Sequence, residues 1–195
     1  MPGAESDTLT AIRSEVLSCT TCHLCTTRTN AVPGEGRPDA TVVIVGEAPG
    51  DTEDRTGKPF QGAAGENLNG LLRRAAIDRA GVFVTNIVKC RPVDGNRNRK
   101  PTPEEVDACL PYLKRQLQLI KPSVVVLLGA TALNAFFPDK KIGDVHGKVL
   151  TIEGQRFFVT YHPAAKIYNK ALGPVMDADF DSLGGIVQSR LSTLP

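Results

Sequence analysis

The sequence predicts an α/β fold in which helices cover both faces of a parallel β-sheet. Three apolar runs have the length of buried strands, at 41–46, 82–88 and 123–129. Apolar residues with helical spacing separate these runs, over 65–80 and again from Pro103 onward. Strands that alternate with helices are typical of a parallel sheet between two helical layers.

The helix after the second strand has the clearest boundaries. Thr102 is placed to cap it, Pro103 takes its first position, and Glu105 completes a capping box. Pro122 is expected to end it, because proline cannot continue a helix. Its apolar side chains fall on one stripe, made of Val106, Cys109, Leu110, Leu113, Leu117 and Ile120.

The rest of the chain predicts shorter elements. We expect one helix over 8–18 and another over 130–137. The segment 148–162 predicts two strands joined by a turn at Gly154. A last helix is expected over about 175–192.

The chain has 195 residues, which is enough for one α/β domain and short for two, so we expect a single domain over 1–195. No apolar run approaches the roughly 20 residues that span a bilayer. The first residues lack the basic and apolar stretches of a secretory signal. We expect a monomeric cytoplasmic protein with no membrane association.

A net charge of +2 does not by itself indicate a nucleic-acid partner. One segment, 89–100, is strongly basic, and its glycine and asparagines predict a loop. It contains a single acid, Asp94, and five cations: Lys89, Arg91, Arg97, Arg99 and Lys100. A basic loop suits phosphate contacts, although charge alone favours an ordinary solvated loop.

The five cysteines favour metal ligation, because disulfides are rare in short cytosolic chains. Cys19 and Cys22 form a chelating pair, and Cys25 repeats the same spacing. Cys90 lies beside a predicted strand end and Cys109 inside the capped helix. Four thiolates can hold zinc or a [4Fe–4S] cluster, and spacing alone does not select the ligands. Taken alone, Cys109 suits a core position equally well.

Glycines and polar residues follow the predicted strands, at the sheet edge where α/β proteins bind ligands. After the first strand, a turn with Gly46, Pro49 and Gly50 either brings backbone close to a ligand or simply links strand to helix. Asn86 and His162 lie at the ends of later strands. The turn lacks both common phosphate-binding motifs, which disfavours a nucleotide cofactor.

In their order and spacing, these segments resemble the family 4 uracil-DNA glycosylases. The resemblance extends over about 19–167, nearly the whole chain. The matching segments are 46–54, 58–72, 82–92, 101–109, 124–132 and 160–165.

The resemblance implies a four-stranded parallel sheet in an α/β/α sandwich like that of uracil-DNA glycosylases. It implies an enzyme that binds uracil-containing DNA and hydrolyses the N-glycosidic bond, which starts base excision repair. Free uracil is released and an abasic site remains. The implied cofactor is a [4Fe–4S] cluster held by Cys19, Cys22, Cys90 and Cys109, with Cys25 outside the set.

The same resemblance gives roles to three side chains. Phe60 is expected to stack on a uracil flipped out of the duplex. The Asn86 amide matches the O4 acceptor and N3–H donor of uracil and mismatches cytosine. His162 is expected to donate a hydrogen bond to the uracil O2 as the leaving base becomes anionic. Without the resemblance, turns at strand ends explain both Asn86 and His162.

The residue that activates water is left open by the sequence. The best-known uracil glycosylases have an aspartate where this chain has Ala48, and alanine is usual there in family 4. Glu47 is the candidate catalytic carboxylate. Its role is either to polarise the water, to stabilise the sugar cation or only to orient the loop. Glu53 is expected to be structural. Gly46, Ala48 and Gly50 are expected to contact the substrate.

Two departures from the family pattern affect these roles. Where the family commonly has an arginine, this chain has none and Ala63 or Ala64 stands nearby, and Lys166 and Ile167 replace two leucines after the histidine motif. Ile167 is therefore the candidate wedge that fills the space left by the flipped base. The alternative to an enzyme is an iron–sulfur protein that binds or covalently traps uracil-DNA without turnover. The basic insertion with a histidine nucleophile that marks the trapping group is absent from the sequence.

Overall fold

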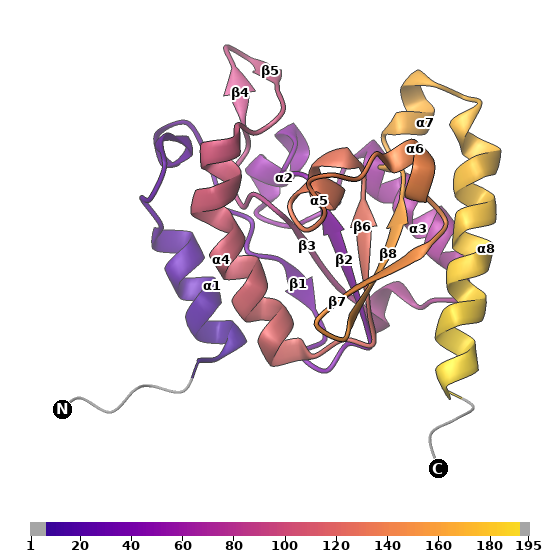
Figure 1. The fold of residues 1–195 in the computed structure, drawn as a ribbon. Helices are drawn as coiled ribbons and strands as arrows, with labels where there is room; N and C mark the ends of the chain where they lie inside the picture. The colour runs from indigo at the N-terminus through magenta and orange to yellow at the C-terminus, as the bar shows by residue number, and fades with distance from the viewer. Residues whose placement is uncertain (1–6, 192–195) are drawn as a thin grey trace.

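A mixed sheet forms the centre of the computed structural model, which describes residues 7–191. Four central strands run parallel, and one antiparallel strand lies at each edge (Figure 1). In spatial order the strands are β1 (Glu35–Gly36), β3 (Phe83–Asn86), β2 (Val42–Gly46), β6 (Val124–Leu128), β8 (Gln155–Thr160) and β7 (Val149–Ile152).

The predicted α/β class and the four parallel strands are confirmed, but the sheet as a whole is mixed. The strand pair β7–β8 was expected from the sequence, and its turn at Glu153 and Gly154 has positive φ angles of 50° and 82°. The edge strand β1 was not expected. It has only two residues, too few to show an alternating pattern, and it pairs through Glu35 with Val84.

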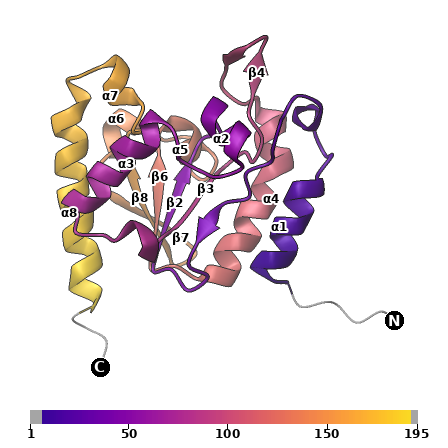
Figure 2. The ribbon, with the colours of Figure 1, turned by 180° about the vertical axis from the view of Figure 1, so that it is seen from behind.

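Two helical layers cover the sheet. α1 (Leu9–Ser18) and α4 (Pro103–Ile120) pack on one face, while α3 (Ala63–Arg74) and α8 (Leu172–Leu191) pack on the other (Figure 2). Successive residues of each strand point to opposite faces, so every central strand is buried on both sides. The shorter helices are α2 (Asp51–Thr56), α5 (Ala130–Asn134), α6 (Ile142–Val145), α7 (Ala165–Tyr168), and the 3-10 turns η1 (His23–Thr26) and η2 (Arg79–Gly81).

Helix α4 begins as predicted. Thr102 Oγ1 accepts a hydrogen bond from the Glu105 N–H, and Glu105 Oε2 accepts one from the Thr102 N–H at 2.8 Å. The helix ends at Ile120, where Lys121 adopts a left-handed conformation with φ 51°. Pro122 follows directly, in agreement with the predicted stop.

Two predictions of local structure were wrong. The helix expected over 65–80 ends at Arg74, because Ala76 has a φ of 54° and turns the chain away. The basic segment 89–100 is not a plain loop, since it folds into a hairpin of β4 (Val93–Asp94) and β5 (Arg97–Asn98).

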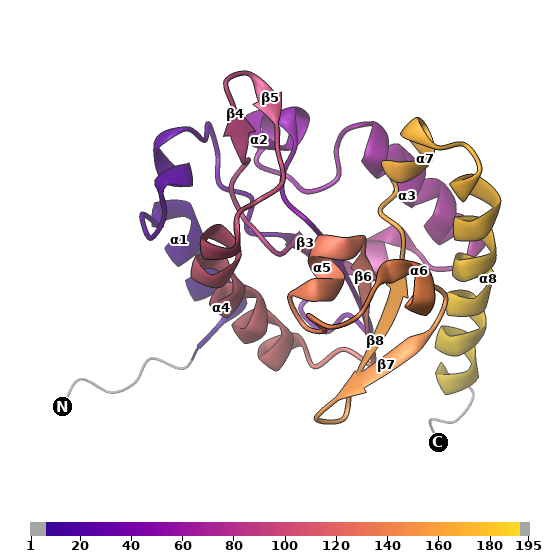
Figure 3. The ribbon, with the colours of Figure 1, turned by 45° about the horizontal axis from the view of Figure 1, so that its top comes forward.

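The carboxyl ends of the parallel strands meet at one edge of the sheet. Figure 3 shows α2, the β4–β5 hairpin, α5 and α7 arranged around this edge. The predicted site residues follow these strand ends, so the topology gathers them in one place. Within residues 7–191, no helix is long and apolar enough to cross a membrane.

Candidate active site

Gly46, Phe60 and Asn86 lie against one another at the end of β2. Gly46 pairs with Asn86 in the parallel β2–β3 ladder. A Cβ atom at Gly46 would collide with the Asn86 amide oxygen and lie 2.7 Å from the Phe60 ring. Glycine is therefore required there for space, and the ring and the amide converge beside its backbone.

The Asn86 side chain has an unused hydrogen-bonding atom. Asn86 is 2% exposed, and its Oδ1 is the one buried side-chain N or O atom without a partner among the described residues. Leaving such an atom unpaired costs about 1–3 kcal/mol. Unpaired buried groups call for a functional explanation, and an N–H donor on a ligand would satisfy this one.

Phe60 is held in an uncommon backbone conformation. Its φ is 54°, a left-handed value that non-glycine residues rarely adopt. The Glu53 carboxylate stabilises the turn, because it accepts hydrogen bonds from the N–H groups of Gln61 at 2.8 Å and Gly62 at 2.9 Å. Its other oxygen accepts from the Gly50 N–H at 3.1 Å. Glu53 thus joins the two loops of the site, which agrees with its expected structural role.

His162 stacks on Phe60, with the ring centroids 5.7 Å apart and the planes 26° from parallel. Burial lowers the pKa of His162 to about 4, against the opposing effect of the Glu53 charge. Its Nδ1 accepts the Ala164 N–H at 3.2 Å, so in the neutral ring the proton is on Nε2. Asn67 on α3 donates a hydrogen bond from its Nδ2 to the Pro163 carbonyl, which fixes the turn after His162 against this helix. His162 is therefore a neutral hydrogen-bond donor near pH 7.

The remaining predicted residues belong to the loop after β2. The Glu47 carboxylate accepts a short hydrogen bond from the Thr131 hydroxyl at the start of α5. Ala48 is partly buried against the core, and Gly50 is the N-cap of α2. The structure thus brings Gly46, Phe60, Asn86 and His162 into one chain of contacts, whereas Glu47 is anchored on α5.

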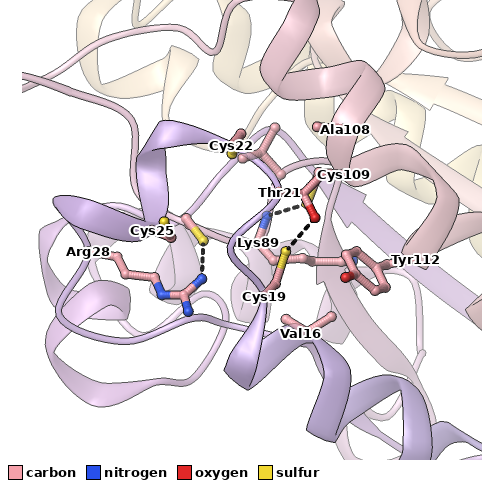
Figure 4. A pocket seen from close by; sticks show the side chains of 12 residues that line it. Val16, Cys19, Thr21, Cys22, Cys25, Arg28, Lys89, Ala108, Cys109 and Tyr112 are labelled. Carbon is pink, nitrogen blue, oxygen red and sulfur yellow. Dashed lines mark hydrogen bonds between the residues drawn. The ribbon is translucent and has the colours of Figure 1, made fainter.

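A second site lies between α1, η1 and α4, where all five cysteines line one cavity. Figure 4 shows the thiols of the N-terminal segment around the same space as that of Cys109 on α4, and Cys90 after β3 lines this cavity as well. The sulfur donors of the cavity are Cys19, Cys22, Cys25, Cys90 and Cys109. Among residues 7–191, no group of three or more His, Cys, Asp or Glu side chains is placed to hold a metal ion.

Positive groups and N–H donors surround these sulfurs. Arg28 Nη1 donates to Cys90 Sγ at 3.1 Å, and the Lys89 backbone N–H donates to Cys109 Sγ at 3.2 Å. Burial raises the pKa of the Cys109 thiol to about 11, so this thiol must lose a proton when it binds a metal. Thiols are the ligand type of an iron–sulfur cluster, although within 7–191 these five are not drawn together into a finished metal site.

Comparison with known proteins decides the family. The model of the Uracil DNA glycosylase superfamily matches residues 33–181. The chain is 41% identical to a type-4 uracil-DNA glycosylase of Sulfurisphaera tokodaii, over 91% of this chain and 84% of the relative. It is 42% identical to the type-4 enzyme of Archaeoglobus fulgidus, over 96% and 98% of the two chains. The chain belongs to the type-4 uracil-DNA glycosylases.

More distant members of the superfamily also match. A type-5 uracil-DNA glycosylase of Pyrobaculum aerophilum is 34% identical over 68% of this chain and 65% of its own. The predicted family is therefore confirmed, and the type-4 relatives match at higher identity and coverage than this type-5 one.

In this type-4 glycosylase, the hairpin cations are not equivalent. The sequence suggested that Lys89 is a surface cation, but its side chain is only 1% exposed. Arg91 Nη1 pairs with Asp51 of α2 at 2.8 Å, and Arg99 pairs with Glu105 of α4 at 2.6 Å. The two remaining cations of the segment are exposed and make no ion pair within 7–191; they are Arg97 and Lys100.

Sequence reasoning missed several residues that support the two sites of this glycosylase. Thr131 binds Glu47, Asn67 binds the histidine turn, and Arg28 binds Cys90. Lys89 was counted among the cations of a solvated basic loop, whereas its side chain is buried. Only long-range contacts reveal these roles, because Arg28 and Cys90 are 62 positions apart and Asn67 and Pro163 are 96 apart.

Proposed function

We propose that the chain hydrolyses the N-glycosidic bond of uracil in DNA and leaves an abasic site, as the names of its type-4 relatives indicate for them. The observation that carries the proposal is the buried, unpartnered Oδ1 of Asn86 beside Phe60. Uracil offers an N3–H donor to this oxygen, and its O4 accepts from the Asn86 Nδ2. Cytosine lacks the N3–H and would leave the oxygen unpaired, at a cost of about 1–3 kcal/mol.

The base reaches this pocket after it flips out of the helix. Phe60 then provides an aromatic surface for the ring. As the bond to the sugar breaks, negative charge grows on the uracil O2, and the neutral His162 donates its Nε2–H to that oxygen. A hydrogen bond that strengthens with this charge stabilises the transition state more than the bound substrate.

The attacking water needs an acceptor for its proton, or the sugar cation needs a nearby negative charge. We assign this role to Glu47, whose Oε2 is fixed by Thr131 and whose other oxygen accepts no hydrogen bond from the described residues. Gly46, Ala48 and Gly50 supply the backbone that lies close to the base and sugar. We assign Glu53 a structural role instead, because its two oxygens already accept three backbone hydrogen bonds.

We propose that Cys19, Cys22, Cys90 and Cys109, which line the cysteine cavity, hold a [4Fe–4S] cluster, as the family resemblance implies. A cluster ligated by four thiolates cross-links the N-terminal segment, the end of β3 and α4, and its binding energy adds to folding energy. The family resemblance leaves Cys25 outside the ligand set, although its thiol lines the same cavity.

DNA contacts are assigned to the exposed residues around this edge. Arg97 and Lys100 suit phosphate binding. Ile167 on α7 is 50% exposed and Tyr168 beside it is 88% exposed, so a large apolar group is available to fill the space left by the base. Ile167 remains our candidate for this wedge.

We further propose that residues 1–195 form one domain that acts as a monomer in the cytoplasm. The matched region 33–181 and the continuous sheet support a single domain. Sedimentation of the protein with and without DNA tests the monomer.

The deciding experiment incubates the protein with oligonucleotides that contain uracil, thymine or cytosine at one position. We expect free uracil, an alkali-labile abasic site and an intact backbone before alkali treatment, with turnover beyond one equivalent. A covalent complex without turnover would support the trapping alternative instead. Borohydride trapping at Lys166, the lysine nearest the histidine motif, would show a strand-cleaving lyase and contradict the proposed simple hydrolysis.

A further inference from the structure

Lys89 is among the largest fully buried side chains of the described residues, with 1% of its surface exposed. Lysine is rarely buried without a partner. Its Nζ donates to Thr85 Oγ1 at 2.6 Å, to the Asn86 carbonyl at 2.8 Å and to Gln116 Oε1 at 2.9 Å. All three N–H bonds of the ammonium are thus used, and none of these acceptors is a carboxylate.

The acceptors join separate parts of the fold. Thr85 and Asn86 belong to the end of β3, and Gln116 belongs to α4. Thr85 Oγ1 and Gln116 Nε2 both donate to the Pro33 carbonyl, at 3.1 and 2.8 Å. The ammonium of Lys89 therefore lies at the centre of a closed network that fixes the strand end on the helix.

This network matters for the Asn86 amide. Because Asn86 Oδ1 has no partner within 7–191, the direction of the amide depends on its packing beside Gly46 and Phe60 and on the backbone that carries it. On the side facing β2, that backbone is held by the parallel ladder and by the bond from the Ile87 N–H to the Gly46 carbonyl at 2.9 Å. The Asn86 carbonyl itself accepts from Lys89.

Lys89 also contacts the cysteine cavity. Its backbone N–H donates to Cys109 Sγ, and the next residue is Cys90. A single residue therefore touches the strand end that presents Asn86 and a candidate ligand of the cluster.

We infer that Lys89 is a positioning residue for uracil recognition, which holds the Asn86 backbone so that its amide faces the base and which joins that strand end to the cysteine cavity. The inference rests on the proposed role of Asn86 in reading uracil. It explains why a charged side chain occupies a position with no exposure to DNA.

Lys89→Met tests this inference, because methionine keeps most of the chain length and removes the ammonium. We measure inhibition by free uracil, the single-turnover rate and affinity for abasic-site DNA, together with iron content and circular dichroism. The inhibition constant for uracil should rise by about tenfold or more, with a matching fall in rate, because one misplaced buried hydrogen bond costs that much. Affinity for abasic-site DNA should not change. Lys114→Met, at an exposed lysine of α4, is the matched control and should behave as the wild type.

A second variant covers the case in which Lys89→Met fails to fold or loses iron. Thr85→Val keeps the shape of the strand residue and removes one acceptor of the ammonium, so uracil inhibition should weaken in the same direction. Wild-type uracil inhibition in Thr85→Val, or in a folded Lys89→Met, overturns the inference. If the wild type itself neither releases uracil nor is inhibited by it, the proposed function fails instead.

Discussion

The chemistry proposed for this glycosylase depends on a histidine that stays neutral. His162 stacks on Phe60, and its Nδ1 is occupied by a backbone N–H, so Nε2 is the only donor that the ring offers. An imidazole fixed in this way gives a hydrogen bond without first having to lose or gain a proton. It therefore suits an oxygen whose negative charge develops only during the reaction.

Replacement of His162 should separate chemistry from binding. We expect His162→Ala to lower the single-turnover rate by about 100-fold or more, with little change in affinity for uracil-containing DNA. Asn86→Ala should lower both the single-turnover rate and the affinity for uracil-containing DNA, because the amide also contacts the base in the ground state. Phe60→Ala should mainly weaken capture of the base, by about 1–3 kcal/mol of stacking. Single-turnover kinetics beside a binding titration at fixed salt measure these effects, and a His162→Ala enzyme with the wild-type rate would remove this residue from the mechanism.

The lowered pKa of His162 predicts an unusual pH profile. An ordinary histidine, with a pKa of about 6.5, changes charge between about pH 5 and 8, whereas His162 with a pKa of about 4 stays neutral there. The single-turnover rate should therefore show no titration of His162 in this range.

The same lowered pKa of His162 affects stability. Because the folded pKa lies below the unfolded one, the unfolded chain binds more protons between these values, and stability should fall as pH decreases from about 6.5 toward 4. NMR titration of the ring checks the pKa, and a midpoint near 6.5 would contradict it.

At the scale of single elements, the hairpin β4–β5 is fixed to the body of the protein by two ion pairs. Arg91 reaches Asp51 at the start of α2, and Arg99 reaches Glu105 in the first turn of α4. Arg91 Nε also donates to Asn98 Oδ1 at 2.7 Å, across the hairpin itself. Arg91 and Arg99 therefore position the hairpin, whereas Arg97 and Lys100 remain available to bind DNA phosphates.

The salt dependence of DNA binding tests this division. Each phosphate contact contributes about 0.7–0.9 to the slope of log affinity against log salt concentration. Arg97→Gln and Lys100→Gln should each reduce that slope by about this amount, and each should weaken binding of uracil-containing and plain DNA alike. Lys121→Gln, a change at the end of α4 away from the hairpin, is the control. Unchanged slopes in both hairpin variants would show that these cations do not contact phosphates.

How much the sequence could predict differs from element to element. The start of α4 was predictable because Thr102, Pro103 and Glu105 are local signals, and the buried strands were predictable because their apolar runs are continuous. The end of α3 was not, since it depends on the φ angle of Ala76, a residue with no turn preference of its own. The burial of Lys89 was also hidden, because its acceptor Gln116 lies 27 positions away on another helix.

For the molecule as a whole, the cysteine cavity lies where the N-terminal segment meets the sheet and α4. α1 packs on α4, and the chain from Cys19 to Arg28 bridges the gap between this helix pair and the end of β3. Arg28 Nη2 also donates to the Leu17 carbonyl at 3.0 Å, so one side chain joins α1 to Cys90. A cluster in this cavity would connect the three parts, and the network around Lys89 would connect it to the base pocket.

The ligand set can be tested through its effect on folding. Because metal-binding energy contributes to folding energy, Cys90→Ala or Cys109→Ala should lower both the iron content and the yield of soluble protein. Cys25→Ala should do neither, although its thiol lines the same cavity, because the family resemblance leaves Cys25 outside the ligand set. Iron analysis and visible absorption of the three purified variants measure the outcome. Loss of iron in Cys25→Ala alone would show that Cys25 is a ligand and that the ligand set taken from the family resemblance is wrong.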